Sequence, residues 1–326
     1  MKRRQLISLF ASTPAIWPLF ASAQQEGKLP RIGVTLAGSN PNSFAEALRR
    51  GLKELGWVDG KTILIEERYA EGQTKRYAGF MSEFIDLKVD VIIAGGGDRV
   101  ARVASELTST IPIVVPVMGD PVASGLLSSL ARPGGNLTGQ SMQASEISAK
   151  RMEFLYRVLP KLEHIALLKD PNSPSAASAT KIAEEAARAL GIHSRVFNAS
   201  RVEEFNTMFD TISASHAKAI MVLTSSFFYI YRQQLVDLAA QRRLAASYEH
   251  QGFVKAGGLM SYGPNLAAMY HSAARYVDKI LKGESPADLP IEQPTQFDLA
   301  INLKTAKTLG LTMPMSILLQ ATEVIE

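Results

Sequence analysis

The chain has 326 residues, of which 46% are hydrophobic, and it carries 35 Lys or Arg against 31 Asp or Glu. This length predicts two domains, and the near balance of charge argues against a nucleic-acid binder. The chain has no cysteine, which excludes disulfides, Cys-ligated zinc, a Cys nucleophile and a lipid anchor on cysteine.

The first 23 residues have the pattern of a secretory signal. Residues 2–4 are basic, residues 6–20 are largely apolar, and residues 21–23 read Ala-Ser-Ala, which is a cleavage pattern. Removal of the three basic residues lowers the formal net charge from +4 to 4 − 3 = +1. We expect cleavage after Ala23 and release into the periplasm, by either the general secretory route or the twin-arginine route.

From residue 31 onward, short apolar runs alternate with segments of helical periodicity, the first of which has capping-box spacing at Ser43 and Glu46. The predicted strands cover residues 32–36, 62–69, 89–94, 113–117, 165–168, 195–197, 219–224, 244–248 and 259–262. The predicted helices cover 44–55, 77–85, 99–108, 145–159, an alanine-rich run to 190, 205–212, 229–241, 265–281 and 305–309. This order predicts two doubly wound α/β lobes with parallel sheets.

In such lobes the loops after the strands gather at one edge of each sheet, where ligands bind. If the two edges face each other, these loops line one cleft. The candidate ligand contacts in or next to these loops are Asn40, Gly96, Gly97, Asp98, Gly119, Asp120, Asn172, Ser225, Ser226, Phe227, Tyr248, Glu249 and Tyr262.

A glycine run, residues 95–97, lies between a predicted strand and a predicted helix. It does not match the dinucleotide-binding pattern, because positions 98 and 100 are Asp and Val. Two interpretations remain open. The run is either a tight turn that needs glycine conformations, or a turn whose N–H groups receive an anion such as a carboxylate.

The candidate acids and hydroxyls each have a structural and a ligand-binding interpretation. Asp120 either caps the next helix or accepts a ligand ammonium, and Glu249 is either a solvated loop acid or a second acceptor. Ser225 and Ser226 are helix caps or cleft donors, and the three aromatic candidates would form an apolar wall. No nucleophile elbow, HExxH motif or catalytic acid pair is present, so we expect no enzyme, metal or cofactor.

Several runs together resemble one known family. They are GDPVASGL at 119–126, ARPGGNLTG at 131–139, GLMSYGPN at 258–265, LPIEQP at 289–294 and INLKTAK at 301–307. These runs are similar to ABC transporter substrate-binding proteins related to the tryptophan-binding TrpX.

The resemblance implies a periplasmic-binding fold of type I with three hinge crossovers between the lobes, which we place near 140–143, 261–263 and 293–295. The first lobe would comprise residues 24–141 and 263–293, and the second lobe residues 142–262 and 294–326.

The resemblance also implies a function. The expected protein is a monomer that closes on a small molecule, with amino acids, aromatic ones among them, as the leading class, and delivers it to an ABC permease in the inner membrane. Two alternatives stay open. The closed form could dock a membrane signalling receptor, or the chain could be an exported α/β hydrolase, for which no nucleophile is recognised.

Overall fold

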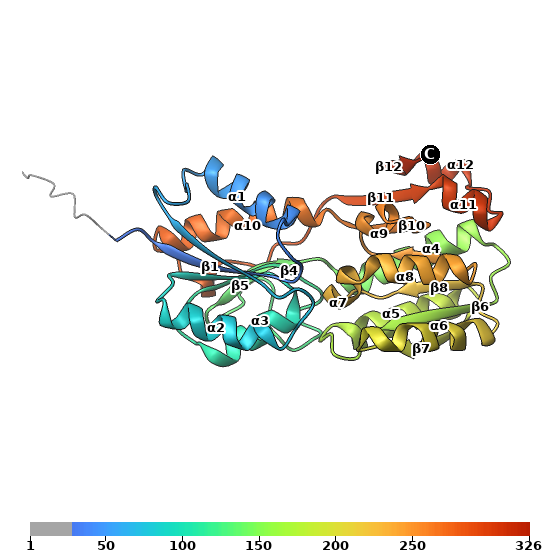
Figure 1. Cartoon of the computed structure of the whole chain (residues 1–326), viewed down its shortest axis with the longest axis horizontal. Helices are drawn as coiled ribbons and strands as arrows, with labels where there is room; N and C mark the ends of the chain where they lie inside the picture. The colour runs from blue at the N-terminus through green and yellow to red at the C-terminus, as the bar shows by residue number, and fades with distance from the viewer. Residues whose placement is uncertain (1–27) are drawn as a thin grey trace, which may run out of the picture.

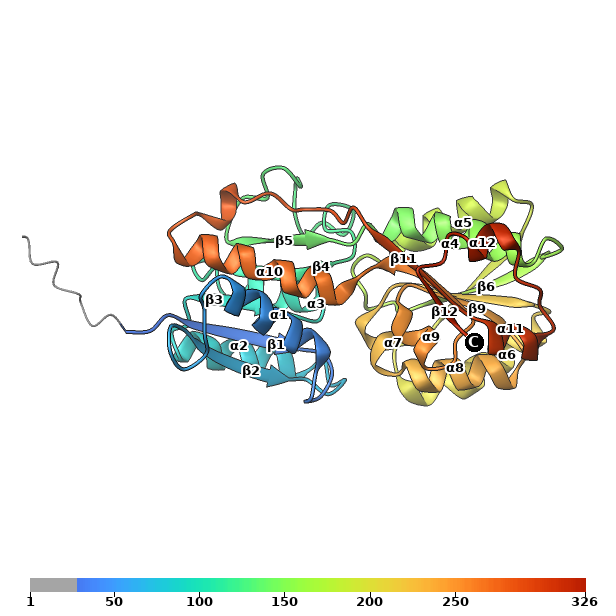
Figure 2. The same cartoon turned by 90° about the horizontal axis from the view of Figure 1, so that it is seen from above.

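The computed structural model describes residues 28–326, so the predicted signal segment lies outside the described residues. Two α/β lobes lie side by side along the long axis of the molecule (Figures 1 and 2). The first lobe contains the blue and cyan N-terminal elements together with the orange helix α10, and the second contains the yellow elements and the red C-terminal end. Among residues 28–326, no helix is both long enough and apolar enough to span a bilayer.

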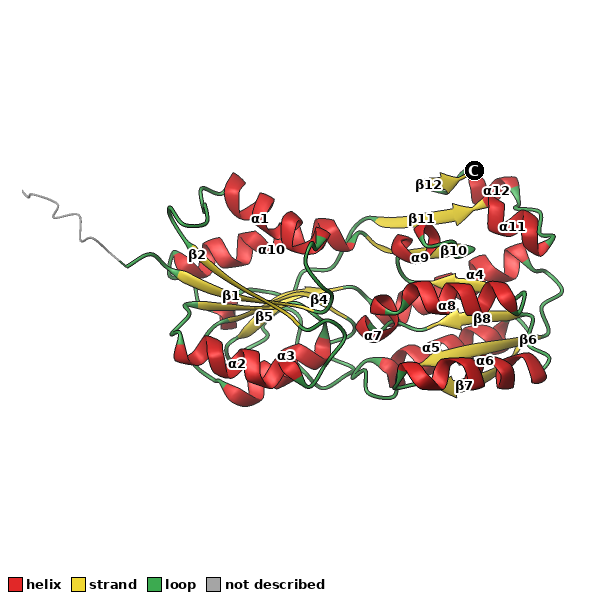
Figure 3. Cartoon of the chain, in the orientation of Figure 1, coloured by secondary structure: helices red, strands yellow, loops and turns green. Residues whose placement is uncertain are grey.

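The first lobe is built on a five-stranded parallel sheet with the order β2-β1-β3-β4-β5. Its strands are β1 (Arg31–Leu36), β2 (Leu64–Tyr69), β3 (Val91–Ala94), β4 (Ile113–Met118) and β5 (Leu137–Ser141). Its helices are α1 (Ser43–Glu54), α2 (Arg76–Asp86), α3 (Asp98–Leu107) and α10 (Leu266–Leu281). Helices α1 and α10 pack together on one face of the sheet, and α2 and α3 pack on the other (Figure 3).

The second lobe is built on a seven-stranded sheet with the order β12-β11-β10-β9-β8-β6-β7. Its strands are β6 (His164–Lys169), β7 (His193–Asn198), β8 (Ala219–Val222), β9 (Ala245–Tyr248), β10 (Met260–Pro264), β11 (Phe297–Asn302) and β12 (Glu323–Ile325). Its helices are α4 (Ala144–Val158), α5 (Ala176–Ala189), α6 (Phe205–Ala214), α7 (Ser226–Ile230), α8 (Arg232–Gln241), α9 (Gln251–Lys255), α11 (Leu303–Leu309) and α12 (Met315–Leu318). Short 3-10 turns occupy Val202–Glu204 and Pro286–Asp288.

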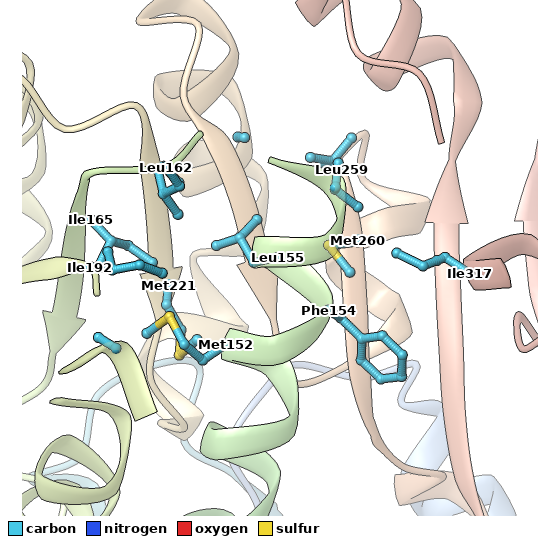
Figure 4. Close-up of a cluster of buried hydrophobic side chains, with 14 of the residues drawn as sticks. Met152, Phe154, Leu155, Leu162, Ile165, Ile192, Met221, Leu259, Met260 and Ile317 are labelled. Carbon is cyan, nitrogen blue, oxygen red and sulfur yellow. The ribbon is translucent and has the colours of Figure 1, made fainter. Parts of the chain in front are cut away.

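Helix α4 supplies much of the core on one face of the second sheet. Met152 and Leu155 project from α4 toward Ile165 of β6 and Met221 of β8, while Phe154 lies beside Met260 of β10 (Figure 4). All six side chains are at most 2% exposed. Burial of such side chains stabilises a fold by about 1.5–3 kcal/mol each, so this face fixes α4 on the sheet.

The chain passes between the lobes three times. It leaves β5 at Ser141 and begins α4 at Ala144, it leaves β10 at Pro264 and begins α10 at Leu266, and it returns along residues 292–297 into β11. This arrangement confirms the predicted fold class, two doubly wound lobes with three crossovers. The sheets are mostly parallel, but β11 runs antiparallel to β10 because the chain re-enters the second lobe beside the strand by which it left.

Several local predictions are corrected by the structure. The N-cap of α1 is Asn42, not Ser43, and its side-chain oxygen accepts the Phe44 N–H at 3.0 Å. The predicted helix over 229–241 is two helices that meet at Tyr231. Strands β5, β11 and β12 and helix α9 were not predicted, because their short, partly polar sequences lack a clear hydrophobic period.

Candidate ligand-binding cleft

A cavity of about 510 Å³ lies between the two lobes. Its walls are the loops after β1, β3 and β4 of the first lobe and those after β6, β8 and β9 of the second, together with the start of α10. This is the edge at which a doubly wound sheet binds ligands. The volume falls in the range of about 300–1,000 Å³ that is typical of small-molecule sites.

Four helices begin at this cavity. The residues at the starts of α1, α3, α5 and α7 all line it, among them Ser43, Asp98, Ser175 and Ser226. A helix N-terminus presents unpaired N–H groups and a positive dipole end, which attract an anion. Asn42 and Ser225 already accept N–H groups at the starts of α1 and α7, and Asp98 places a carboxylate in the first turn of α3. Of these four helices, α5 has neither a side-chain cap nor an acid in its first turn, so its start is the position best suited to a carboxylate.

An aromatic cluster closes one side of the cavity and joins the lobes. Phe44 of α1 stacks on Tyr270 of α10, with ring centroids 4.9 Å apart and planes 12° apart. Across the gap, Phe44 also lies 5.7 Å from Tyr229 and 6.1 Å from His250 of the second lobe, measured between ring centroids. Phe44, Tyr229 and Tyr270 line the cavity. They form a wall suited to a flat apolar group, and contact across the gap shows that the lobes are closed.

A set of polar contacts also links the lobes. Asp98 accepts a hydrogen bond from the Gly119 N–H at 2.8 Å and another from the Ser175 hydroxyl of the second lobe. Arg99 reaches Asp170 of the second lobe at 3.4 Å. Burial raises the pKa of Asp98, and its two hydrogen-bond donors oppose this rise.

Asp170 is also satisfied within the protein. Its second contact is the Ser225 hydroxyl at 2.8 Å, and its other oxygen accepts the Asn172 N–H at 2.9 Å. The carboxylate oxygens of Asp98 and Asp170 thus already accept hydrogen bonds from protein donors, so neither acid has an unpaired oxygen to offer a ligand.

Glu249 is the acid in the cavity that is left with an unused oxygen. It lines the cavity and is 4% exposed, and its Oε2 lacks a hydrogen-bond partner among the described residues. Thr224 lines the same cavity, and its buried Oγ1 has no partner there either. Burial raises the pKa of Glu249 to about 7, while Arg151 acts to lower it. A cationic group in the cavity beside these residues would provide hydrogen-bond donors for both Oε2 of Glu249 and Oγ1 of Thr224.

The glycine run is a tight turn at the start of α3. Gly96 and Gly97 have φ angles of +131° and +83°, and a Cβ on Gly96 would lie 2.7 Å from a methyl carbon of Val100. The Gly96 N–H is already donated to the Tyr270 hydroxyl. Glycine is required here for its backbone conformation, and the N–H of Gly96 is not free for an anion.

The predicted site residues divide into two sets. Those that line the cavity are Gly96, Gly97, Asp98, Gly119, Ser225, Ser226 and Glu249. Those that do not line it are Asn40, Asp120, Asn172, Phe227, Tyr248 and Tyr262.

The polar residues of the second set have other surroundings. The Asp120 carboxylate accepts hydrogen bonds from the Ser145 hydroxyl at 2.8 Å and from the Ala123 N–H at 3.1 Å. It therefore caps the turn that follows β4, whereas the predicted structural role was to cap a helix, and no helix lies between β4 and β5. Asn40 and Asn172 are exposed loop residues.

The three predicted wall aromatics pack inside the second lobe or at the crossovers. The Phe227 ring centroid lies 5.5 Å from that of Phe205, and Tyr248 stacks on Phe253 at 4.5 Å. Tyr262 lies against Phe297 at the crossovers, with ring centroids 5.6 Å apart. The wall is instead made by Phe44, Tyr229 and Tyr270, which were not predicted. Their sequence signal is weak and lies only in position, because Phe44 is in the first turn of the helix that follows β1 and Tyr229 is two residues from Phe227.

Three comparisons with known proteins agree with this geometry. A family model described as ABC transporter substrate binding protein matches residues 32–325. A tyrosine-binding protein from Clostridioides difficile (strain R20291) is 23% identical over 286 residues, which are 87% of this chain and 82% of that protein.

Among solved structures, two similar ones differ in their ligand state. An ABC domain from Streptococcus pneumonia in complex with L-Trp has 23% identity and a TM-score of 0.85, and the match covers 91% of this chain and 100% of that one. A ligand-free, open substrate-binding protein with adhesive properties from Clostridium difficile has 23% identity and a TM-score of 0.67, with coverage of 91% and 99%.

Proposed function

Because the chain belongs to the ABC transporter substrate-binding protein family, we propose that it captures an amino acid with an aromatic side chain in the periplasm and delivers it to an inner-membrane permease. The observation that carries this proposal is the cavity of about 510 Å³, whose walls come from both closed lobes. A site of this kind holds a small molecule only while the lobes are together.

The lining matches the three parts of such a ligand. The start of α5, which has neither a side-chain cap nor an acid in its first turn, suits a carboxylate. Glu249, with its unused oxygen beside Thr224, suits an ammonium group. The wall of Phe44, Tyr229 and Tyr270 suits an aromatic ring. The names of two relatives agree with this class, since one is a tyrosine-binding protein and another was solved with L-Trp.

The proposed mechanism is closure about the three crossovers. A ligand shifts the balance between open and closed forms only through contacts that both lobes make at once. Here the aromatic wall comes from both lobes, whereas Glu249 and the start of α5 come from the second lobe. The TM-score of 0.85 to the L-Trp complex, against 0.67 to the open ligand-free protein, supports a closed, ligand-competent arrangement.

Export and delivery complete the proposal. The signal pattern in residues 1–23 supports a periplasmic location, and the family supports an ABC permease as the partner. The function ends with release of an unchanged ligand, so the chain itself needs no catalytic group.

The test is a ligand screen of the mature protein after unfolding and refolding to remove any ligand that co-purifies. L-Tryptophan, L-tyrosine and L-phenylalanine should raise the melting temperature, because they bind only the folded form. Benzoate, which lacks the ammonium, and nucleosides should not. Titration calorimetry should then give one site per chain. A rise with benzoate or nucleosides alone would overturn the ligand class. Delivery to the permease is tested by comparing uptake of the labelled amino acid in cells with and without the gene for this protein.

A further inference from the structure

Arg151 is a buried cation beneath the floor of the cavity. It projects from α4, its side chain is 0% exposed, and its Nη2 donates hydrogen bonds of 2.6 Å to the Val222 and Ser247 carbonyls. These carbonyls lie at the carboxyl ends of β8 and β9. The guanidinium therefore ties together the two strand ends from which Thr224 and Glu249 enter the cavity.

The pairing of Arg151 is incomplete. Its Nη1 has no hydrogen-bond partner among the described residues, and neither has Oε2 of Glu249. No ion pair within 4.0 Å joins the two side chains in the described part of the chain, although their charges act on each other. Burial favours the neutral form of Glu249, whereas the hydrogen bond from its own backbone N–H and the nearby Arg151 cation favour the ionised form. Glu249 is held between these two tendencies.

We propose that Arg151 is a positioning residue that poises Glu249 between its neutral and ionised forms, so that binding of a ligand ammonium drives a proton from Glu249 into solvent. The step balances: the neutral carboxyl loses H⁺ to the buffer, and the resulting carboxylate pairs with the ammonium, which keeps its own protons. This inference rests on the proposed function. It adds that ligand capture is linked to pH.

The other groups around Glu249 do not supply this charge. Tyr248 and Tyr229 have pKa values raised by burial, so both phenols are neutral, and burial lowers the pKa of His250 to about 3, so its ring is neutral too. The remaining charged residues that line the cavity are Asp98, Arg99, Asp170, Arg232 and Glu71. The first three are bonded to one another or to protein donors, Arg232 donates to the Tyr229 carbonyl, and Glu71 pairs with Arg76.

The linkage has a definite sign and size. In this closed arrangement burial raises the pKa of Glu249 to about 7, and a bound ammonium would stabilise the ionised form. Binding at pH 7 should therefore release about half a proton per ligand, and affinity should fall about tenfold from pH 8 to pH 6.

The first experiment needs no ligand. The ligand-free mature chain is labelled with ¹³C at the glutamate side-chain carboxyls and titrated by NMR, and the Glu249 resonance is identified by its loss in Glu249→Gln. A midpoint near pH 7 is expected, whereas a midpoint between 4 and 5 would overturn the proposal. Arg151→Met should move the midpoint upward, and Arg151→Lys should restore it. Should Arg151→Met fail to fold, the wild-type and Arg151→Lys midpoints still decide.

The second experiment uses L-tryptophan as the probe. Calorimetry at pH 7 in two buffers of different ionisation heat counts the protons released, and titrations from pH 5.5 to 8 give the affinity profile. Glu249→Gln should bind weakly with a flat profile, and Glu106→Gln, on an exposed part of α3, should keep the wild-type profile. Tight binding with no proton release would overturn the proposal and leave the proposed function standing. A midpoint near pH 7 without any amino-acid binding would do the reverse.

Discussion

A close approach of the two lobes beside the cavity gives a sharp test of closure. A Cβ added at Gly119, in the first lobe, would lie 2.3 Å from Oγ and 2.9 Å from Cβ of Ser175, in the second lobe. Gly119 does not have a positive φ angle, so its backbone conformation is one that alanine can adopt. The Cβ would also lie 3.0 Å from Oδ2 of Asp98 in the first lobe, but its two shorter contacts are both to Ser175. Gly119→Ala should therefore act mainly by wedging the lobes apart.

The size of the effect follows from these distances. Non-bonded carbon atoms rest at about 3.5–4.0 Å, so the two loops must separate by about 1 Å. Overpacking of this kind costs about 1–3 kcal/mol. The open form avoids the clash by rotating, so the whole cost falls on the closed, ligand-bound form. Each 1.4 kcal/mol is a factor of ten, and Kd should rise about 10- to 100-fold.

The assay compares calorimetric Kd with the melting temperature of the ligand-free protein. Gly79→Ala is the matched control, because its Cβ would meet nothing within 4 Å and the residue lies in α2 of the same lobe. Ser175→Gly added to Gly119→Ala removes both clashing atoms and should recover part of the affinity, although Asp98 loses a donor. An unchanged Kd in Gly119→Ala, or a fall in stability as large as the loss of binding, would refute the reasoning.

Three further perturbations separate the cavity from its surroundings. At pH 8, Glu249→Gln should weaken binding of L-tryptophan at least tenfold in calorimetry, because a charge-assisted bond is lost. Asp120→Asn is the control and should leave Kd unchanged, because the Asp120 carboxylate lies outside the cavity lining. Equal losses in the two variants would remove the assignment of Glu249 as the acceptor of the ammonium. Phe44→Leu should raise Kd for aromatic amino acids with little loss of stability, because Phe44 lines the cavity. Phe227→Leu should lower the free energy of unfolding by about 1 kcal/mol and leave Kd unchanged, because Phe227 packs in the core. The reverse result would show that Phe227, not Phe44, contacts the ligand. Burial lowers the pKa of His250 to about 3, so its contribution to the free energy of unfolding is complete above pH 6.5 and is lost as the pH falls toward 3. Between pH 7.5 and pH 5 the wild type should therefore lose about 2 kcal/mol more stability than His250→Asn, as measured by urea unfolding. Equal losses in the two proteins would contradict a buried neutral ring.

The elements with a clear hydrophobic pattern could be predicted from the sequence. Strands β3 and β8 are apolar runs buried on both faces, and α10 has a long amphipathic period after its cap at Asn265. Strand β11 could not be predicted as antiparallel, because its direction depends on where the chain returns across the lobes. Register and direction are tertiary properties that a local pattern does not contain.

A site residue could be predicted from the sequence only where its place directly after a strand puts it in the cleft. Glu249 follows β9 directly, so the rule for carboxyl ends of strands places it in the cleft. The aromatic wall needs more than this rule. Phe227 and Tyr229 are two residues apart on α7, and residues at that spacing point to different sides, so one enters the core and the other the cavity. The meeting of Phe44 with Tyr270 depends on the packing of α1 on α10, which the sequence does not reveal.

Helix α10 imposes an order on folding. The chain makes β1 to β5 first, yet the face of that sheet under α1 is covered only when residues 266–281 return from the second lobe. A nascent chain that ends before residue 266 would expose apolar side chains of β1 and β3 to water. The lobe that is synthesised first is thus completed only after most of the second lobe has been synthesised, and the long-range contacts that finish it make slow folding expected.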